Sequence, residues 1–294
     1  MGLLSGLEKL GIKNVDQVEL YEKEAAKKVV KEEKKETEDP AKKAPVSSEK
    51  DYLLVKTYEC PACGKKFKDL TLKSNKARLL STDLDLRPRY ETIEPLKYEA
   101  VLCPNCGYAA IGRYFGFLSP TQKKFVAEQV SANYEAGNEI GGDTYTYEQA
   151  LKRNQMCLLN AIVKKGKASE KAYICLKSGW LVRCMQEDLD PEAEDYEEQK
   201  KRLTEQEDEF LQGAMDGFIE ARTKEGVYPM CGMDEMTLDF LISVLALRFD
   251  QLDVSSKLIA TILTSTSASQ RLKEKAREVK DLIIRRINEK KKNG

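Results

Sequence analysis

The sequence predicts an α+β protein that is mostly α-helical, with a small β module ahead of a helical array. Two observations lead to this fold class. CPACGKKF at residues 60–67 returns in outline as CPNCGYAA at residues 103–110, and a run rich in aromatic and branched residues precedes each copy, as is typical of a strand. After Ser119-Pro120, a pair typical of a helix start, apolar residues recur at helical spacing.

The N-terminal 50 residues are predicted to be a short helix and a linker. Leu3, Leu7 and Leu10 fall at i, i+4 and i+7, which predicts a short amphipathic helix within residues 1–21. Residues 22–50 are highly charged and hold almost no large apolar side chains, so burial cannot offset the entropy of ordering them. We expect a charged linker there, disordered or partly helical.

Residues 51–118 are predicted to form a zinc-ribbon-like module. Two C-P-x-C-G motifs supply four thiolates that can point at one ion, and the glycine after each motif suits a left-handed backbone. The spacer between the motifs is longer than the 15–20 or so residues of a simple ribbon, so the module carries an insertion. The predicted metal ligands are Cys60, Cys63, Cys103 and Cys106.

The predicted cofactor is one structural zinc ion. Iron in a rubredoxin-like site has the same ligand geometry, so the sequence leaves both metals open. A site closed by four thiolates has no open position for water and replaces part of a core that a small module lacks. We therefore predict no catalytic residue and no enzymatic activity.

Residues 119–294 are predicted to be an all-helical domain. Apolar residues share one face in the segment around residues 150–162 and in another around residues 210–221, and residues 238–263 carry a dense apolar pattern. The four remaining cysteines have no ligand spacing, so we interpret them as buried thiols. These are Cys157, Cys175, Cys184 and Cys231.

Composition excludes several classes of function. The chain has no histidine, so serine–histidine pairs, cysteine–histidine pairs and zincin motifs are impossible. Lysine and arginine together number 49, as do aspartate and glutamate, so no global charge favours nucleic acid. No apolar run approaches the roughly 18 residues of a membrane span, which favours a cytoplasmic protein.

The run from Leu53 to Ala110 resembles the N-terminal part of a bacterial family catalogued as a domain of unknown function, common in Firmicutes. The resemblance implies metal binding and no established activity. It rests on the two C-P-x-C-G segments, which we call the first and second knuckle, and on spaced polar residues between them. The matching positions are Cys60–Phe67, Ser74, Lys76, Arg78, Asp83, Asp85, Tyr90, Pro95, Tyr98 and Cys103–Ala109.

The C-terminal half resembles tetratricopeptide repeats more loosely. Asp239 stands where that repeat has tryptophan, and Tyr173, Leu176 and Trp180 suggest a second unit. An ordinary helical bundle is the alternative. The large–small–large rhythm is carried by Ile242, Ser243, Ala246, Leu252, Ser255, Ile259 and Ile262.

Three functions follow in order of preference. The first is a non-enzymatic, metal-binding scaffold whose helical array binds a protein or peptide. The second is nucleic-acid binding through the basic stretch between Lys65 and Arg78, which contains Phe67. The third is an enzyme of unknown activity, with a polar pocket in the cluster within residues 76–98. Its candidate residues are Arg78, Asp83, Asp85, Arg87, Arg89 and Tyr90.

Overall fold

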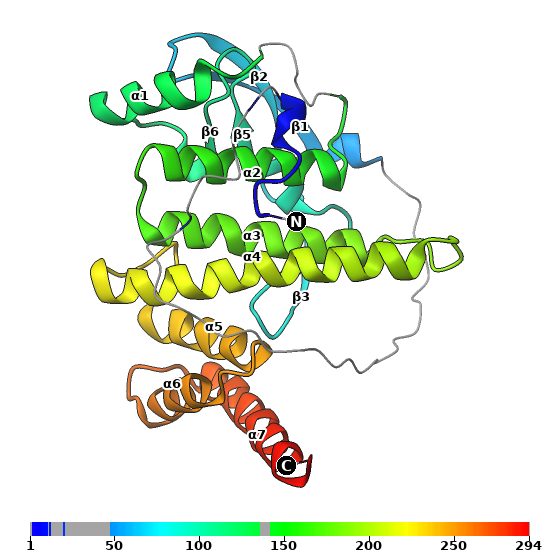
Figure 1. Ribbon diagram of the computed structural model, residues 1–294, viewed down its shortest axis with the longest axis vertical. Helices are drawn as coiled ribbons and strands as arrows, with labels where there is room; N and C mark the ends of the chain where they lie inside the picture. Colours follow the sequence, from blue (N-terminus) through cyan, green and yellow to red (C-terminus); the bar gives the residue numbers. More distant parts are fainter. Residues whose placement is uncertain (1, 11, 13–19, 21–47, 136–141, 294) are drawn as a thin grey trace.

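The computed structural model describes residues 2–10, 12, 20, 48–135 and 142–293. The strands on either side of the two knuckles lie at one end of the molecule, strand β3 (Leu79–Thr82) lies lower beside the long helices, and those helices stack toward the C-terminus (Figure 1). Within the described residues, helices dominate and the strands form only small antiparallel pairs, which confirms the predicted α+β, mostly α class. The division into domains and the tetratricopeptide-like arrangement stay predictions.

The described part of the chain has three two-stranded sheets, each an antiparallel hairpin. Strand β1 (Leu53–Glu59) pairs with β2 (Lys66–Leu72), and the first knuckle forms their turn. Strand β5 (Ala100–Leu102) pairs with β6 (Ala109–Ile111) around the second knuckle. Between them, β3 (Leu79–Thr82) and β4 (Pro88–Tyr90) form the predicted insertion. The 3₁₀ helices η3 (Glu49–Tyr52), η4 (Pro95–Tyr98) and η5 (Gly112–Tyr114) flank these strands.

The helical part begins at α1 (Pro120–Val126), which continues into a π-helical turn, η6 (Ala127–Ser131). The helix starts at Pro120, as Ser119-Pro120 predicts, and Ser119 and Gln122 form a capping box there. A second capping box joins Thr146 to Gln149. The longer helices are α2 (Tyr147–Val163), α3 (Ala168–Glu187), α4 (Tyr196–Lys224), α5 (Glu235–Arg248), α6 (Leu252–Thr264) and α7 (Gln270–Asn293).

Small residues let neighbouring helices approach closely. A Cβ atom on Gly179 of α3 would lie 2.7 Å from Leu211 Cδ2 of α4, so only glycine fits there. Between α5 and α6, Ser255 Oγ donates a 2.8 Å hydrogen bond to the carbonyl of Ser243, and both serines are fully buried. The small residues of the predicted rhythm therefore lie in a helix–helix contact.

The strands and helices share a hydrophobic core. Residues of β5, β6 and the second knuckle join α2, α3 and α4 in one buried cluster. A separate cluster joins α5, α6 and α7, and Leu84 and Leu86 of the β3–β4 turn pack against it. The hairpin inserted between the knuckles thus reaches from the sheets to the C-terminal helices (Figure 1).

The described N-terminal residues lie on the helical array. Leu4 and Leu7 are buried in the main core, and Gln155 Nε2 of α2 donates to the carbonyls of Leu3 and Ser5 at 3.0 and 3.1 Å. The one helical turn among the described residues of this N-terminal segment is η1 (Leu7–Leu10). The rest of the helix predicted within residues 1–21, and nearly all of the predicted linker, lies outside the described residues. Glu49, at the linker's end, belongs to η3.

Candidate metal centre

Both knuckles have the same backbone geometry. The amide of Cys60 donates to the carbonyl of Lys65 at 3.0 Å, and that of Cys103 donates to Tyr108 at 2.8 Å. Each turn ends in a left-handed glycine, Gly64 at φ 73° and Gly107 at φ 70°, which a side chain would strain. Each glycine amide donates to the carbonyl of the first cysteine of its motif. The repeated motif therefore folds twice into the same thiolate-presenting turn.

The two turns bring the four predicted ligands together. All four sulfur atoms lie within 4.8 Å of one another, and no other group of three or more cysteine, aspartate or glutamate side chains in the described residues meets the geometry of a metal site. Cys60 Sγ is 3.7 Å from Cys106 Sγ, and Cys63 Sγ is 3.8 Å from Cys103 Sγ. A zinc ion with bonds of about 2.3 Å to four tetrahedral sulfurs requires edges of about 3.8 Å. The residues therefore fit a four-thiolate metal site.

Hydrogen bonds among the sulfurs shift the pKa values of Cys60, Cys103 and Cys106 in opposite directions. A hydrogen bond from Cys106, then one from Cys60, lowers the pKa of Cys103, and its hydrogen bond with Cys103 raises the pKa of Cys106. The pKa of Cys60 is raised to about 12, first by its hydrogen bond with Cys103. This pattern favours the thiolate at Cys103 and the thiol at Cys60 and Cys106. A divalent cation would balance the charge of further thiolates, so metal binding releases protons.

Helix α2 holds the second knuckle in place. Asn160 of α2 is fully buried, and its Nδ2 donates to the carbonyl of Gly107 at 3.0 Å. On the other side of the knuckle, a Cβ atom on Gly107 would lie 2.6 Å from the ring of Tyr134. The glycine is thus required both by its backbone angle and by this close approach.

A buried ion pair joins the first hairpin to α2. Asp69 of β2 and Arg153 of α2 are both buried and contact each other directly. Tyr145 donates to Asp69 Oδ1 at 2.5 Å, and Arg153 donates to the carbonyl of Ala100 in β5 at 3.0 Å. The network crosslinks both hairpins to the same helix. Asp69 and Arg153 compensate each other's charge inside the core, which makes the network stabilising.

The other four cysteines do not form a second site in the described structure. Cys157 lies in α2, while Cys175 and Cys184 lie in α3, and all three are buried. Burial raises the pKa of Cys175 and of Cys184 to about 12 and also raises those of Cys157 and Cys231. These thiols stay protonated at neutral pH. Cys157, Cys175 and Cys184 are buried as predicted. The prediction is wrong for Cys231, which is half-buried in a turn and donates to the carbonyl of Ser169 at 3.3 Å.

Most of the predicted polar cluster makes ion pairs between the β3–β4 hairpin and α3. Arg183 of α3 contacts Asp85 at 2.6 Å and Asp83 at 3.2 Å. In the other direction, Glu187 accepts from Arg87 at 2.5 Å and from Arg89 at 2.9 Å. Burial alone would raise the pKa of Asp85, but Arg183 outweighs it, and the pKa is lowered. These charges fasten the insertion to the helices.

A polar cleft of about 320 Å³ lies beside this network and is lined by Tyr90, Glu94 and Cys184 among others. Cys184 Sγ donates to Glu94 Oε2 at 3.7 Å. Burial raises the pKa of Glu94. Burial also raises the pKa of Cys184, so its thiol stays protonated. The pair therefore lacks the thiolate that a cysteine nucleophile requires.

The basic stretch before Arg78 presents lysines but no free ring. Lys65, Lys66, Lys68 and Lys76 are exposed. Phe67 is buried and stacks on Tyr58 with ring centroids 5.8 Å apart. The ring of Phe67 is therefore not available for stacking with the bases of a single-stranded nucleic acid, which stack on exposed aromatic side chains. The lysines form a solvated face.

Apart from Asp69, the residues that support the four-cysteine site have no signal in the sequence. Asn160, Asp69 and Arg153 stand on opposite sides of long segments, and nothing in their spacing predicts that they meet. The one signal that was available is Asp69, a charged residue between Lys68 and Leu70 in an otherwise half-apolar strand. A carboxylate that β2 turns inward needs a buried partner.

The fold and site together define a mostly helical protein with a four-cysteine module that fits a metal ion and precedes the helices. The chain belongs to the family described as "Uncharacterized protein conserved in bacteria (DUF2225)", whose profile matches residues 53–283. This confirms the resemblance to a bacterial family of unknown function. Its link to Firmicutes stays a prediction. No curated protein and no solved structure matches the chain. Among the described residues, no helix is both long and apolar enough to cross a membrane.

Proposed function

We propose that this protein is a non-enzymatic, zinc-stabilised scaffold that works in the cytoplasm and binds a protein partner through its helical array. The observation that carries the zinc assignment is the separation of the sulfur atoms, 3.7 and 3.8 Å in the two closest pairs, which suits zinc–thiolate bonds. Four protein ligands complete the tetrahedron, so the ion has no open position for a substrate. Reduced thiols are stable in the cytoplasm.

The scaffold role is supported by how the module is attached. The hairpins contribute to the same core as α2, α3 and α4, and the inserted hairpin is fastened to α3 by ion pairs. A metal that rigidifies this end also positions the helices that follow. Stacked helices offer extended surfaces that suit protein or peptide partners.

Elemental analysis tests the metal assignment. We expect one equivalent of zinc in the purified protein and its loss in Cys103→Ser, while Cys231→Ser, outside the four-cysteine site, keeps it. One equivalent of iron instead of zinc would replace the metal but keep the site. No metal, or a full equivalent in Cys103→Ser, would contradict the site itself.

Copurification from a native bacterial cell tests the scaffold role. We expect one dominant protein to be retained by the full chain. Recovery of RNA or ribosomal proteins instead would favour nucleic-acid binding, and its salt dependence would show whether the exposed lysines around Phe67 carry it.

A further inference from the structure

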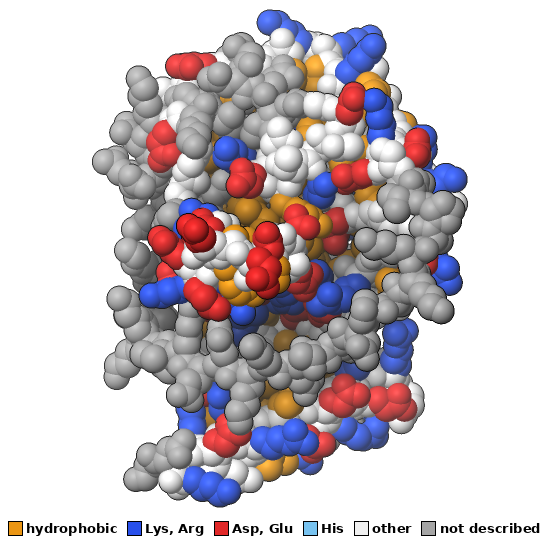
Figure 2. All heavy atoms as spheres, turned by 90° about the vertical axis from the view of Figure 1, so that its right-hand side faces the viewer, with side chains coloured by type: hydrophobic (Ala, Val, Ile, Leu, Met, Phe, Trp, Pro, Cys, Tyr) orange, Lys and Arg blue, Asp and Glu red, His pale blue; other side chains and the backbone are white. Residues whose placement is uncertain are grey.

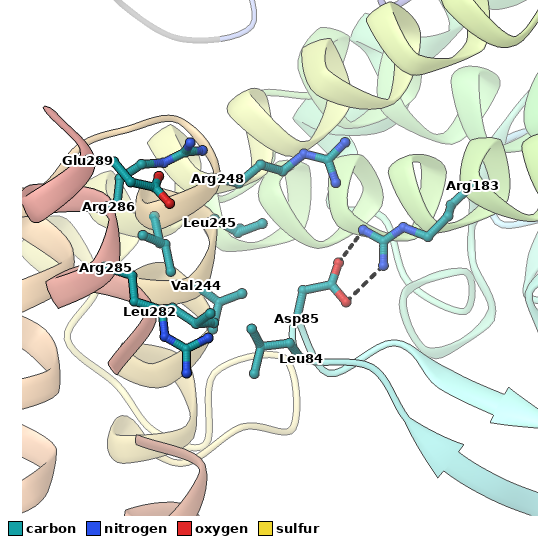
Figure 3. A pocket seen from close by; sticks show the side chains of 11 residues that line it. Leu84, Asp85, Arg183, Val244, Leu245, Arg248, Leu282, Arg285, Arg286 and Glu289 are labelled. Atoms are coloured by element: carbon teal, nitrogen blue, oxygen red, sulfur yellow. Dashed lines mark hydrogen bonds and ion pairs between the residues drawn. The ribbon is translucent and has the colours of Figure 1, made fainter. Parts of the chain in front are cut away.

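A groove of about 620 Å³ separates α5, α7 and the β3–β4 turn. Figure 3 shows side chains of α5 and α7 facing one another across it, with Leu84 and Asp85 of the turn between them and Arg183. It is open along one side, and its two long walls are helices. That shape suits a third helix, because side chains on one helix pack into the space between two others.

The floor of the groove is apolar. Val244 and Leu247 come from α5, Leu282 comes from α7, and Leu84 comes from the turn. Leu282 lies beside the buried face of α7, yet 39% of it is exposed. A stripe of leucine and valine at the bottom of an open groove matches the apolar face of an amphipathic helix.

The side walls differ in how well their charges are balanced. Arg183 and Arg248 both contact Glu207 at 2.8 Å, so their charges are compensated within the protein. Arg286 lies 3.9 Å from Asp250, whose other oxygen already contacts Lys290. Arg285 makes no ion pair or hydrogen bond with the described residues. Both α7 arginines are exposed and line the groove together with Glu289, the one acidic residue of α7 in its lining (Figure 3).

The excess of positive charge extends along α7. The helix holds ten lysines and arginines against four acidic residues, although the whole chain is neutral. Negative charge is concentrated elsewhere, with eight acidic residues between positions 187 and 198 at the α3–α4 corner. Figure 2 shows acidic side chains gathered at the projecting corner and basic side chains beneath it. An acidic partner is therefore attracted to the arginines of α7 and repelled by the acidic α3–α4 corner.

We propose that this groove binds an acidic amphipathic helix of a partner protein, which rests on the scaffold function proposed above. The partner's apolar stripe covers Leu84, Val244 and Leu282, and its flanking carboxylates pair with Arg285 and Arg286. Guanidinium groups bind carboxylates in a bidentate way, which fixes the orientation of the helix. Nucleic acid fits less well, because a phosphate backbone would leave the apolar floor unused.

Two labelled peptides test the groove. Each has 18 residues with a leucine stripe, flanked by glutamates in one and by lysines in the other. Binding to the zinc-loaded full chain is measured by fluorescence anisotropy. We expect the acidic peptide to bind at least about tenfold more tightly, a difference of about 1.4 kcal/mol. Arg285→Glu/Arg286→Glu should reverse the preference, while Leu282→Asp should weaken both peptides.

The matched control is Lys123→Glu/Lys124→Glu, which reverses two exposed charges on α1, far from the groove in sequence. It should keep the wild-type preference, and melting curves should show that all variants fold. Equal binding of the two peptides, or a preference that the α7 variant leaves unchanged, would overturn the proposal.

Other occupants give distinct results. A wild-type dimer that Arg285→Glu/Arg286→Glu converts to a monomer would assign the groove to a second copy and overturn the proposal of a foreign partner. Binding to anionic phospholipid vesicles without binding of the acidic peptide would overturn it in favour of a membrane surface. A protein that copurifies equally with wild type and the α7 variant would overturn the groove but keep the scaffold function.

Discussion

Individual buried side chains connect the insertion to the helices. Trp180 of α3 is 5% exposed, as its apolar neighbours Tyr173 and Leu176 predict, and its Nε1 also donates to Asp85 Oδ2 at 3.1 Å. The sequence predicts the burial, because position in a helical pattern is local information. It does not predict the hydrogen bond, because Asp85 is 95 positions away. Asp85, a candidate pocket residue from sequence, forms an ion pair with Arg183 and also lines the groove beside α5 and α7.

Trp180→Ala should lower the free energy of unfolding by about 3–5 kcal/mol, the usual cost of removing a buried aromatic ring. Trp180→Phe keeps most of the ring but leaves Asp85 one donor short, so we expect a smaller loss, about 1–3 kcal/mol. Urea denaturation of the zinc-loaded proteins measures both. Equal losses in the two variants would show that the hydrogen bond, and not the packing of the ring, dominates.

Asp239 gives stability a dependence on pH. It is fully buried, and burial raises its pKa to about 6 from an ordinary 3.8, although Arg222 acts in the opposite direction. The folded state therefore binds a proton more tightly than the unfolded state does. The stabilising contribution of that proton is fully present below about pH 4 and is lost as the pH rises through 6.

Asp239→Asn should remove this dependence. The stability of the wild type relative to the variant should fall by about 1 kcal/mol between pH 5 and pH 7. Urea denaturation at pH 5, 6 and 7 measures the difference, in which contributions from all other titrating groups and from the metal cancel. A difference that stays constant, or rises with pH, would contradict the raised pKa.

At the scale of elements, the sequence predicts helix caps and turns, but it does not predict which elements pack against one another. Ser119-Pro120 and both C-P-x-C-G turns form as predicted, because each depends on residues within a few positions of one another. The β3–β4 hairpin is visible only as an insertion. Its contact with the C-terminal helices depends on Leu84 and Leu86 meeting a core formed by residues more than 150 positions later.

The N-terminal segment is an element whose docking can be measured. Leu7 is fully buried in the main core although it belongs to a single 3₁₀ turn. Leu7→Ala should therefore lower the free energy of unfolding by about 2–5 kcal/mol, as in other cores. Its neighbour Glu8 is exposed, so Glu8→Ala is the matched control and should change stability by less than about 0.5 kcal/mol. Equal melting temperatures for wild type and Leu7→Ala would mean that the segment is a frayed tail.

At the scale of the whole molecule, the four-cysteine site joins two distant parts of the chain, and a metal bound there would crosslink them. Cys63 and Cys103 are 40 positions apart, and the inserted hairpin lies between them. The paired motifs predict this crosslink, since four soft ligands at that spacing have few other uses. They do not predict that the knuckles share a core with α2 and α3. A buried cysteine or alanine can pack against any apolar surface, so its identity does not indicate its partner.

Removal of the metal should therefore unfold the molecule in a graded way. Thiols freed from the ion leave β1, β2, β5 and β6 with short ladders only, and α2 loses the surface formed by β5 and β6. The cluster formed by α5, α6 and α7 contains none of the four ligands and keeps its own buried residues. We expect chelation to abolish amide protection in β1, β2, β5 and β6, to lower it in α2, and to leave α6 and α7 nearly unchanged.

Hydrogen exchange followed by mass spectrometry resolves these segments, with zinc re-addition as the test of reversibility. The β3–β4 turn is the informative part, since it lies between the ligands yet is held by ion pairs to α3 and by Leu84 on the C-terminal core. Its protection should fall less than that of β1 and β2. If protection fell uniformly over all helices, the metal would control one cooperative unit, and the separate core of α5, α6 and α7 would not be an independent source of stability.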